Sequence, residues 1–577
     1  MKTLFVLLTL CMLQISWCKI DQTWWKHTTI YEVFLPSFKD GNGDGMGDLK
    51  GLISKLDHFV DLGIETVYIT PHYESPMVDS GYDITNFVAV NPVMGTMEDF
   101  EMLIKEMKIR GLKLIIDLII NHSSDEHPWF IKSVNKEHPY TDYFIWKDPK
   151  GYDTNGKPTV PNNWLNVFGG SAWEWNDKRK QFYYHQFTPK QPDFNLRNKL
   201  LKTEIKKIFK FWLDKGVAGF RLDAVKHLLE DAEFRDEPVS SPDIKVPIQY
   251  QDLRHIYTQN VWDSYQFLHE LRVFIERVTR KFTDFERVLI SEDYVEGELL
   301  TKYYGTEKYK IVHVPLNFNL AYIIRYENAN YYHNVINDYL RILPEGGTPA
   351  WNAENHDKFR KAFILNEEFE FTFASMVLTL PGMAYLYYGQ EIGVTGSKIR
   401  PDQEVNKFPD DFTKVSRDYF RHPMAWDDSL NGGFTNNEKA YLPLNSNYWR
   451  VNVKSRKSED NAGYYHMFKK IVNLRNTDTL KYGDFKSFVI STWVFAYTRK
   501  LEGRESYVMI YNLGSETEFV DLNDSIDDLP EFMTIEVASP NSGYQVGEQL
   551  PTGQQIPKIL ILRPYMTLIL STRSSNA

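Results

Sequence analysis

The stretch GFRLDAVKH, residues 219–227, decides how the rest of the chain is interpreted. A helix is predicted before it, over residues 198–214, and a glycine at position 216 ends that helix. The stretch begins as a short apolar run, which is typical of a buried strand. Arg221 and Asp223 lie two residues apart, so their side chains share one face of the strand. Because buried charges are costly unless they are paired, the two residues form either a structural ion pair or part of a functional site.

Predicted strands and helices alternate on both sides of this stretch. Apolar runs predict strands at residues 29–38, 63–70, 113–120, 288–292, 311–318 and 382–388. Helical periodicity lies between them, at residues 49–62, 97–110, 265–279 and 366–380. Apolar strands that alternate with helices indicate a parallel sheet covered on both faces. Eight such units would close a (β/α)8 TIM barrel.

Two segments interrupt the alternation. Residues 123–190 are rich in Trp, Tyr, Asn, Gly and Pro, and they are too long for a plain loop. They predict an irregular domain inserted after the third strand, so that the barrel occupies residues 19–122 and 191–484. Short alternating strands over residues 485–577 predict a C-terminal antiparallel β-sandwich domain. A length of 577 residues fits two or three such domains.

Charge and hydropathy narrow the cellular context. A net charge of -11 argues against a nucleic-acid partner, because phosphate binding needs clustered Lys and Arg. The apolar run after Lys2 and the small residues before position 18 predict a signal peptide over residues 1–18, and hence a secreted protein. A membrane anchor is the alternative, but the run is short for one, and the C-terminal tail lacks a lipid-anchor signal. Both cysteines, Cys11 and Cys18, lie in this segment, so we expect no disulfide in the mature chain.

The loop DGNGDGMGD, residues 40–48, carries oxygen ligands at every second position with glycines between them. This spacing allows a loop to fold around a hard cation. A helix-loop-helix calcium motif does not fit, because the twelfth position is Gly51 and a strand precedes the loop. A solvated acidic turn is the alternative. We expect a structural Ca²⁺ ion, with no organic cofactor, held by Asp40, Asn42, Asp44, Asp48 and the carbonyl of Met46.

Polar residues gather at the predicted carboxyl ends of the strands, where the active sites of such barrels lie. They are Asp117, Asn121 and His122 in and after the third strand, Arg221 and Asp223 in the fourth, Glu292 and Asp293 in the fifth, and Asn355, His356, Asp357 and Arg360 later. Several carboxyl groups at one barrel mouth suit glycoside hydrolysis. In that reaction one carboxylate attacks the sugar and a second carboxyl group protonates the leaving oxygen.

Residues 117–122, 219–227, 292 and 355–357 resemble the four short motifs of the α-amylase family of glycoside hydrolases. QPDFN, residues 191–195, resembles the additional motif of the oligo-1,6-glucosidase and α-glucosidase branch. The likeness, which is greatest to secreted insect maltases, extends to the loop at 39–51 and to VDSGYD, residues 78–83. It implies a retaining α-glucosidase that releases α-glucose from the non-reducing end of maltose-like oligosaccharides or sucrose, and that can transfer glucose to other acceptors.

The resemblance also implies a role for each matching residue. Asp223 corresponds to the nucleophile, Glu292 to the acid/base and Asp357 to the acid that stabilises the transition state. The substrate-binding residues would be Arg221, which orients the nucleophile, His122 and His356, which bind sugar hydroxyls, Tyr82, which stacks on the sugar, and Asp79 and Arg421, which pair to close the pocket.

Some positions depart from the family pattern without removing a catalytic group. Glu354 stands where Gly is usual, Asp293 where a small residue is usual, and His422 and Ala425 where Thr and Gln are usual. Glu354 and Asp293 add acid near the site, so we expect them to affect the pH optimum. Ala224 resembles relatives that prefer α-1,4 bonds. The alternative function is that of a non-catalytic relative, such as a transporter ectodomain or a receptor-like binding protein, but such relatives lose catalytic acids and need a membrane anchor.

Overall fold

The structure is a computed structural model that describes residues 23–282, 284–406, 415–553 and 559–573. The predicted signal peptide and both cysteines lie outside the described residues. Within the described ranges, no helix combines the length and the apolar character that crossing a membrane requires.

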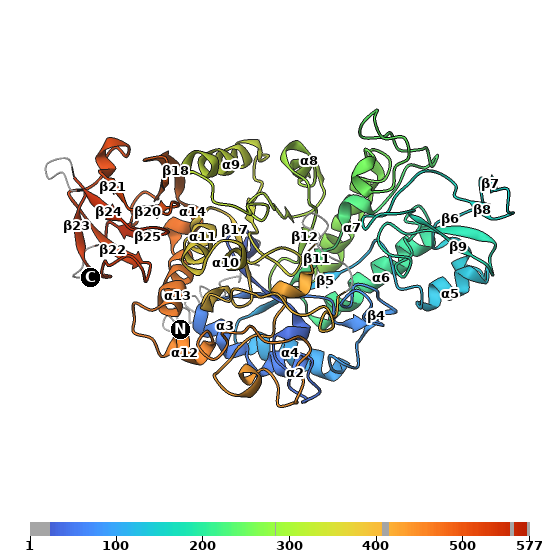
Figure 1. The fold of residues 1–577 in the computed structure, drawn as a ribbon, viewed down its shortest axis with the longest axis horizontal. Helices are drawn as coiled ribbons and strands as arrows, with labels where there is room; N and C mark the ends of the chain where they lie inside the picture. Colours follow the sequence, from blue (N-terminus) through green and yellow to red (C-terminus); the bar gives the residue numbers. More distant parts are fainter. Residues whose placement is uncertain (1–22, 283, 407–414, 554–558, 574–577) are drawn as a thin grey trace, which may run out of the picture.

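Eight parallel strands form the central sheet, in the order β15-β12-β11-β5-β2-β1-β17-β16. Across its two outer strands, the N–H of Asn352 donates to the carbonyl of Asn317 at 3.2 Å. The sheet is therefore a nearly closed TIM barrel, which confirms the predicted fold (Figure 1). The strands are β1 (Thr29–Val33), β2 (Thr66–Ile69), β5 (Lys113–Leu118), β11 (Gly219–Leu222), β12 (Val288–Ser291), β15 (Val314–Pro315), β16 (Ala350–Trp351) and β17 (Met383–Tyr387).

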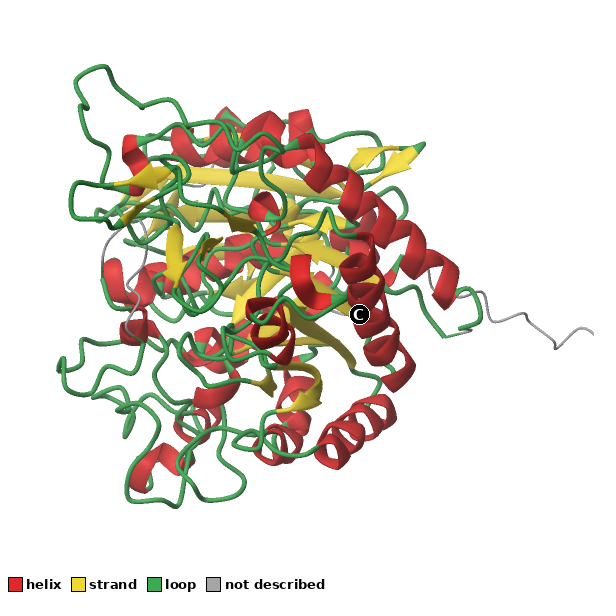
Figure 2. Cartoon of the chain, turned by 90° about the vertical axis from the view of Figure 1, so that its right-hand side faces the viewer, coloured by secondary structure: helices red, strands yellow, loops and turns green. Residues whose placement is uncertain are grey.

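Helices surround this sheet (Figure 2). The predicted helix at 49–62 is two helices, because Lys55 leaves the helical conformation with φ -115° and ψ 8°. Helix α6 lies within one residue of the predicted limits at each end, since Asn198 caps its first turn and Gly216 ends it at φ 105°. The helices are α2 (Leu49–Ser54), α3 (Leu56–Leu62), α4 (Met97–Ile109), α6 (Lys199–Lys215), α7 (Trp262–Thr279), α8 (Gly297–Lys302), α9 (Ala329–Ile342), α10 (Lys361–Ile364), α11 (Glu367–Thr379), α12 (Val453–Lys457), α13 (Tyr464–Arg475) and α14 (Asp478–Tyr482).

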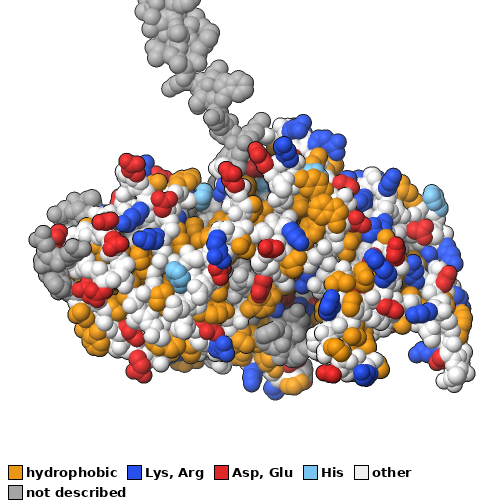
Figure 3. Space-filling model, turned by 90° about the horizontal axis from the view of Figure 1, so that it is seen from above, with side chains coloured by type: hydrophobic (Ala, Val, Ile, Leu, Met, Phe, Trp, Pro, Cys, Tyr) orange, Lys and Arg blue, Asp and Glu red, His pale blue; other side chains and the backbone are white. Residues whose placement is uncertain are grey.

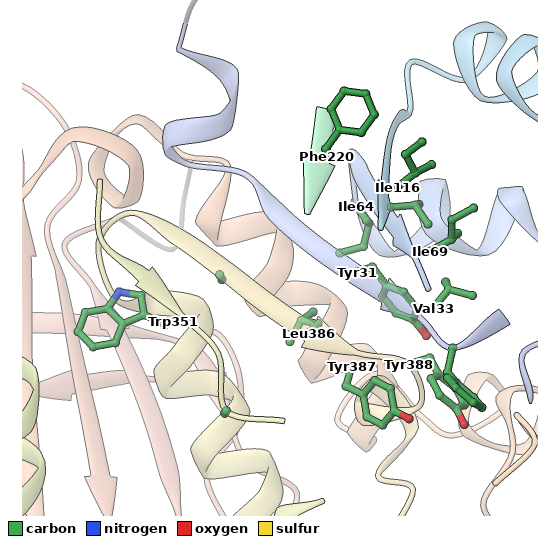
Figure 4. Packing of buried hydrophobic residues seen from close by; sticks show 14 of the residues in the cluster. Tyr31, Val33, Ile64, Ile69, Ile116, Phe220, Trp351, Leu386, Tyr387 and Tyr388 are labelled. Atoms are coloured by element: carbon green, nitrogen blue, oxygen red, sulfur yellow. The ribbon is translucent and has the colours of Figure 1, made fainter. Parts of the chain in front are cut away.

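The barrel strands are buried on both faces, and alternate residues face different cores. Tyr31 and Val33 of β1 pack in the layer between sheet and helices, with residues such as Ile116 and Phe220 (Figure 4). Ile30 belongs to the cluster inside the barrel. The side-chain period of two therefore points Glu32 inward as well, at the carboxyl end of β1.

The segment after β5 forms a small aromatic unit at one end of the molecule (Figure 1). An antiparallel bridge between His122 and Asp193 closes its base, so the QPDFN segment lies beside the end of β5. Trp164, Trp173 and Tyr184 are buried at its centre. Its elements are α5 (Pro128–Val134), the sheet of β6 (Trp146–Lys147), β10 (Gln181–Tyr184) and β9 (Trp173–Asn176), and the hairpin of β7 (Gly151–Tyr152) and β8 (Pro158–Thr159).

A six-stranded antiparallel sheet forms the C-terminal domain at the opposite end (Figure 1). Phe495 and Tyr497 face the barrel helices, while Val494 and Ala496 face the small sheet of β21 and β24. Alternation along β19 thus fills both faces, as predicted for a sandwich. The strands are β18 (Asp484–Val489), β19 (Val494–Lys500), β20 (Tyr507–Asn512), β25 (Thr567–Ser571), β22 (Phe532–Ala538) and β23 (Gln549–Pro551), with β21 (Glu518–Val520) and β24 (Leu560–Leu562) opposite. Two short hairpins complete the fold, β3 (Tyr73–Glu74) with β4 (Asn86–Val90), and β13 (Gly305–Thr306) with β14 (Tyr309–Lys310).

Candidate active site

A pocket of about 890 Å³, open to solvent, lies over the carboxyl ends of the barrel strands. Acidic, basic and aromatic side chains line it together: Asp79, Tyr82, His122, Val167, Phe168, Phe187, Gln191, Asp223, Ala224, Lys226, His227, Tyr250, Glu292, Asp293, Tyr294, Asp357, Lys358 and Arg417. The structure therefore brings the predicted acids Asp223, Glu292 and Asp357 to one pocket.

Asp223 and Glu292 follow neighbouring parallel strands at the same level, because Leu222 pairs with Ser291 in the register of β11 and β12. Arg221 contacts both carboxyl groups, at 2.5 Å from Asp223 Oδ1 and 3.4 Å from Glu292 Oε1. Its NH1 also donates to both oxygens of Asp117 at 3.0 Å. A single buried guanidinium thus fixes the relative position of two carboxyl groups on adjacent strands.

The backbone turns sharply after Asp223. Ala224 has φ 50° and ψ 37°, a left-handed conformation that costs a non-glycine residue about 1–2 kcal/mol. In this conformation its N–H donates to Glu292 Oε2 at 3.1 Å. The turn therefore aims a backbone donor at the second carboxyl group, and the strain is part of the site.

Electrostatics set the protonation of these acids. Burial raises the pKa of Asp223 well above its ordinary value; Arg221 opposes this rise, and the charges of Glu292 and Asp117 add to it. Burial would likewise raise the pKa of Asp357, but His356 and three arginines hold it well below the ordinary range. Asp357 therefore stays ionised, whereas ionisation of Asp223, which a nucleophile requires, depends on its contact with Arg221.

A buried chain of hydrogen bonds places His356. Its Nδ1 and its N–H both contact Glu32 Oε1, at 2.6 and 3.0 Å, and Nε2 lies 2.6 Å from the Tyr82 hydroxyl. The Tyr82 hydroxyl also donates to Asp117 Oδ2 at 2.8 Å, while its ring stacks 5.6 Å from the imidazole. Glu32 was not among the predicted site residues, although its inward place near the end of β1 follows from strand alternation.

Arg417, rather than the predicted Arg421, makes the contact with Asp79, and both arginines bind Asp357. The sequence resemblance implied a pair between Asp79 and Arg421, but Arg417 makes this contact, at 2.8 Å. Arg417 also binds Asp357 Oδ1 at 2.7 Å. Arg421 lies deeper, where it donates to the His356 carbonyl at 2.6 Å and to Asp357 Oδ1 at 2.7 Å. Stacking of Arg421 over Phe34, at 4.9 Å, directs it away from Asp79.

The remaining predicted residues lie around one side of the pocket. Gln191 Nε2 is 3.2 Å from Asp79 Oδ2 and 3.3 Å from His122 Nε2, so the QPDFN segment contacts the pocket directly. Burial lowers the pKa of His122 to about 4, which keeps its imidazole neutral and able to bind hydroxyl groups. Phe187, whose ring lies 5.1 Å from His122, was not predicted, because an aromatic residue in an irregular segment carries no positional signal.

Asp293, Glu354 and Arg360 were also expected near the site, but their positions differ from those of the three catalytic acids. Asp293 lies at the pocket wall, and burial raises its pKa to about 7; the charge of Glu292 adds to the rise and Lys226 opposes it. Glu354 is buried and does not line the pocket. Arg360, predicted at the mouth, instead stacks over Tyr387 and Tyr388 at 4.3 and 4.9 Å.

The loop at 40–48 has the donor types that suit Ca²⁺, but backbone groups engage them. Asp40 Oδ1 accepts the N–H groups of Asn42 and Gly43, at 3.0 and 2.6 Å, and Asp48 Oδ2 accepts two more. Within the described ranges, no group of three or more His, Cys, Asp or Glu side chains is placed to hold a metal ion. The carboxylates of Asp40, Asp44 and Asp48 alone would not complete a site for a hard cation. Such a site would also need the Asn42 amide oxygen and the Met46 carbonyl as ligands.

Comparison with known proteins places this geometry in a family. The alpha amylase catalytic domain model matches residues 32–483. An alpha-glucosidase of Culex pipiens is 37% identical over 557 residues, which are 96% of this chain and 92% of that protein. A mutant of the trehalulose synthase MutB superposes with a TM-score of 0.81 at 30% identity, covering 95% of this chain and 100% of that chain.

The same comparison finds a transport protein. The amino acid transporter heavy chain SLC3A1 of Rattus norvegicus is 34% identical over 520 residues, which are 89% of this chain and 74% of that protein. The match to the catalytic domain model nevertheless spans most of the chain, including all nine predicted catalytic and substrate-binding residues from Asp79 to Arg421. The chain belongs to the alpha-amylase family of glycoside hydrolases.

Proposed function

We propose that the protein is a secreted, retaining α-glucosidase that releases α-glucose from the non-reducing end of maltose-like oligosaccharides or sucrose. The observation that carries the proposal is the placement of Asp223 and Glu292 at one level on adjacent strands, joined by Arg221, beside a pocket that Asp79, Arg417 and Asp357 close. The alpha-glucosidase of Culex pipiens, similar over nearly the whole chain, supports this activity.

The mechanism follows from the two carboxyl groups. Glu292 gives its proton to the glycosidic oxygen as the bond from that oxygen to the anomeric carbon breaks. The Asp223 carboxylate forms the new bond to the anomeric carbon, which gives a β-glucosyl ester. Glu292 then takes a proton from water, whose oxygen displaces Asp223 and restores the α configuration. Positive charge develops on the sugar in both steps, and the ionised Asp357 stabilises it.

End-wise cutting follows from the contacts of Arg417. The guanidinium joins Asp79 and Asp357 at 2.8 and 2.7 Å, and Asn406 donates to Asp79 from the same side at 3.2 Å. A chain extended beyond the bound glucose would have to separate these groups, which buried ion pairs resist. The pocket thus accepts one terminal glucose, and the released product is glucose rather than an internal fragment.

Initial rates on maltose, sucrose, isomaltose and 4-nitrophenyl α-glucoside test the proposal. Proton NMR of the first products should show α-glucose before β-glucose; the reverse order would mean inversion. In a maltoheptaose digest we expect glucose and maltohexaose. Early maltotriose and maltotetraose with little glucose would contradict the closed pocket. Sucrose activity and glucosyl transfer to a second sugar are measured in the same assays.

The similarity to the transporter heavy chain favours a second candidate, a non-catalytic binding protein. The presence of all three acids at one pocket argues for catalysis instead. A protein that binds maltose but hydrolyses none of the four glucosides would support the binding role. Charges of both signs are interspersed on the face that Figure 3 shows, and we propose no nucleic-acid partner.

We also propose that the loop at 40–48 binds one structural Ca²⁺ ion. The donors would be the carboxylates of Asp40, Asp44 and Asp48, the Asn42 amide and the Met46 carbonyl. A ligand that binds only the native state raises its stability by mass action. The melting temperature should therefore fall with a chelator and recover with calcium. A melting temperature that ignores both, in a protein purified without metal, would contradict the proposal.

A further inference from the structure

A cluster of buried charges lies outside the pocket, next to the loop that carries His356 and Asp357. Its members are Glu354, Arg360, Lys361 and Glu370, each at most 1% exposed. None of the four lines the pocket, and the mechanism above uses none of them. Removing charged groups from water is costly unless their interactions compensate, so the cluster requires an explanation.

Glu354 joins the two ends of this loop. Its Oε1 accepts the N–H of Lys361, the first residue of α10. Within the loop, the Asn355 side chain accepts the N–H of Asp357 at 2.9 Å, so the loop is short and internally bonded. Because His356 and Asp357 lie between the two ends, the distance between these ends sets where Asp357 enters the pocket and where the buried His356 meets Tyr82.

Two charged side chains lie near the Glu354 carboxyl group, those of Lys361 and Glu370. Lys361 Nζ donates to the carbonyls of Ala321 and Ile323, at 2.9 and 2.7 Å, which fastens the loop to the segment between β15 and α9. Glu370 faces Glu354 from α11, and its Oε1 accepts the Gln390 amide at 2.7 Å. The carboxyl group thus lies between a fastened lysine and a helix.

We propose that Glu354 is a positioning residue for the α-glucosidase reaction, holding the loop at 355–360 so that Asp357 meets the terminal glucose and His356 keeps its contact with Tyr82. The inference rests on the proposed function. Glycine, the residue usual at this position in the family, has no side chain with which to accept the Lys361 N–H. The hydrogen bond from the Lys361 N–H to Glu354, which we call the brace, therefore depends on this glutamate side chain.

The charges around Glu354 make the brace sensitive to pH. Burial, and then the charge of Glu370, raise the pKa of Glu354 well above its ordinary value, and Arg360 opposes the rise. Burial lowers the pKa of Lys361 to about 8. Tyr464 of α13 faces both carboxyl groups, and burial and the Glu370 charge raise its pKa. In this cluster the neutral form of Glu354 is favoured over the ionised form, because ionisation of Glu354 would place a second negative charge beside Glu370.

The direction of the pH effect follows from linkage. A folded-state pKa above the unfolded value, about 4.3 for Glu, means that the folded protein binds more protons over the interval between the two. The stability contributed by Glu354 is complete below that unfolded value, and it is lost as the pH rises through the raised folded value. Glu354→Gln removes this titration and keeps an oxygen that can accept the Lys361 N–H.

The test compares E354A and E354Q with E368Q, a control at an exposed glutamate of α11. We expect E354A to lower kcat on 4-nitrophenyl α-glucoside by about 10- to 100-fold, since small misplacements of catalytic groups cost that much. E354Q should recover most of this loss and flatten the pH dependence of stability. Amide hydrogen exchange in peptides covering residues 355–361 should accelerate in E354A, and stay at the wild-type rate in E354Q and E368Q.

Unchanged kcat and exchange in E354A would overturn the inference, and so would an E354Q variant as impaired as E354A. If E354A does not fold, E370Q provides the second measurement. Without the Glu370 charge, the pKa of Glu354 falls, so the loss of stability at rising pH should shrink; an unchanged pH dependence in both E370Q and E354Q would contradict the brace. A wild type that hydrolyses no α-glucoside would refute the proposed function, whereas the exchange data would still decide whether Glu354 holds the loop.

Discussion

The two sides of the pocket are held by different means. Asp223 and Glu292 follow β11 and β12 directly, and the ladder continues beyond them, since Glu292 N–H donates to Leu222 at 2.8 Å. Asp357 and Arg417 lie on long connections, where buried side-chain contacts place them. We call these the strand side and the loop side.

The difference shows how stability is distributed around the reaction. The geometry of the strand side depends on backbone hydrogen bonds that belong to the barrel, so it persists unless the barrel unfolds. The loop side depends on Glu32, Glu354 and the arginines, whose interactions change with protonation and with substitution. We therefore expect substitutions on the loop side to misplace catalytic side chains, and substitutions on the strand side to remove a group that reacts with the sugar.

The largest effect should come from the strand side. Asp223→Asn keeps the shape of the side chain, but the neutral amide cannot form the glucosyl ester. We expect turnover to fall by about 10⁴-fold or more, as for other catalytic groups that act as a unit, with the fold intact. Near-normal turnover of a stable D223N variant would show that another group attacks the sugar.

The next largest effect should come from the loop side. Arg417→Gln leaves Asp79 and Asp357 without the guanidinium they share, and breaking a buried ion pair costs about 3–5 kcal/mol. We expect kcat/KM for maltose to fall by about 100- to 5,000-fold, since 1.36 kcal/mol corresponds to tenfold. Arg400→Gln is the control, because its partner Asp402 forms an exposed pair. Equal activity of R417Q and R400Q would disprove the role of Arg417 in closing the pocket.

Sequence reasoning was most successful on the strand side. Short apolar runs that end in charged residues predicted β11 and β12 with Asp223 and Glu292 at their ends, because in a parallel sheet the strand alone fixes where such residues lie. The loop side has no such regularity. Arg417 and Arg421 are four residues apart in one irregular turn, and tertiary contacts, such as the stacking of Arg421 over Phe34, accompany the choice of Arg417 as the partner of Asp79.

The barrel itself was predictable from alternating elements, but the limits of its last strands were not. The run at 311–318 pairs with β12 only at Val314 and Pro315, and β16 is similarly short. Residues on either side have the same apolar character, and tertiary pairing rather than propensity decides where the ladder ends. Glu32 was missed for a related reason, because a single acid within a strand resembles an ordinary surface residue until the strand is known to be buried.

A pH experiment tests whether an acid on the strand side, Asp293, also changes the stability of the protein when it ionises. Burial raises the pKa of Asp293, directly after Glu292, to about 7, from an unfolded value near 4. The stability it contributes is therefore complete below pH ~4 and lost as the pH rises toward 7. At about 1.4 kcal/mol per pKa unit, this loss reaches a few kcal/mol. Asp293→Asn should remove the corresponding slope in denaturant unfolding between pH 4 and 7. An unchanged slope would mean that Asp293 is solvated as in the unfolded chain.

The smallest effect tests the connection between the two sides. The Tyr82 hydroxyl joins them, since it donates to Asp117 Oδ2 at 2.8 Å and lies 2.6 Å from His356 Nε2. Tyr82→Phe keeps the stacked ring and removes this link, and a buried hydrogen bond contributes about 0.5–1.5 kcal/mol. We expect kcat/KM to fall about tenfold with little change in melting temperature.

Tyr68→Phe is the matched control, because the Tyr68 hydroxyl donates to the same Asp117 oxygen at 2.7 Å without contacting His356. If the two sides act through this link, Y82F loses more activity than Y68F. Equal losses would show that Asp117 alone matters and that the loop side is positioned without Tyr82.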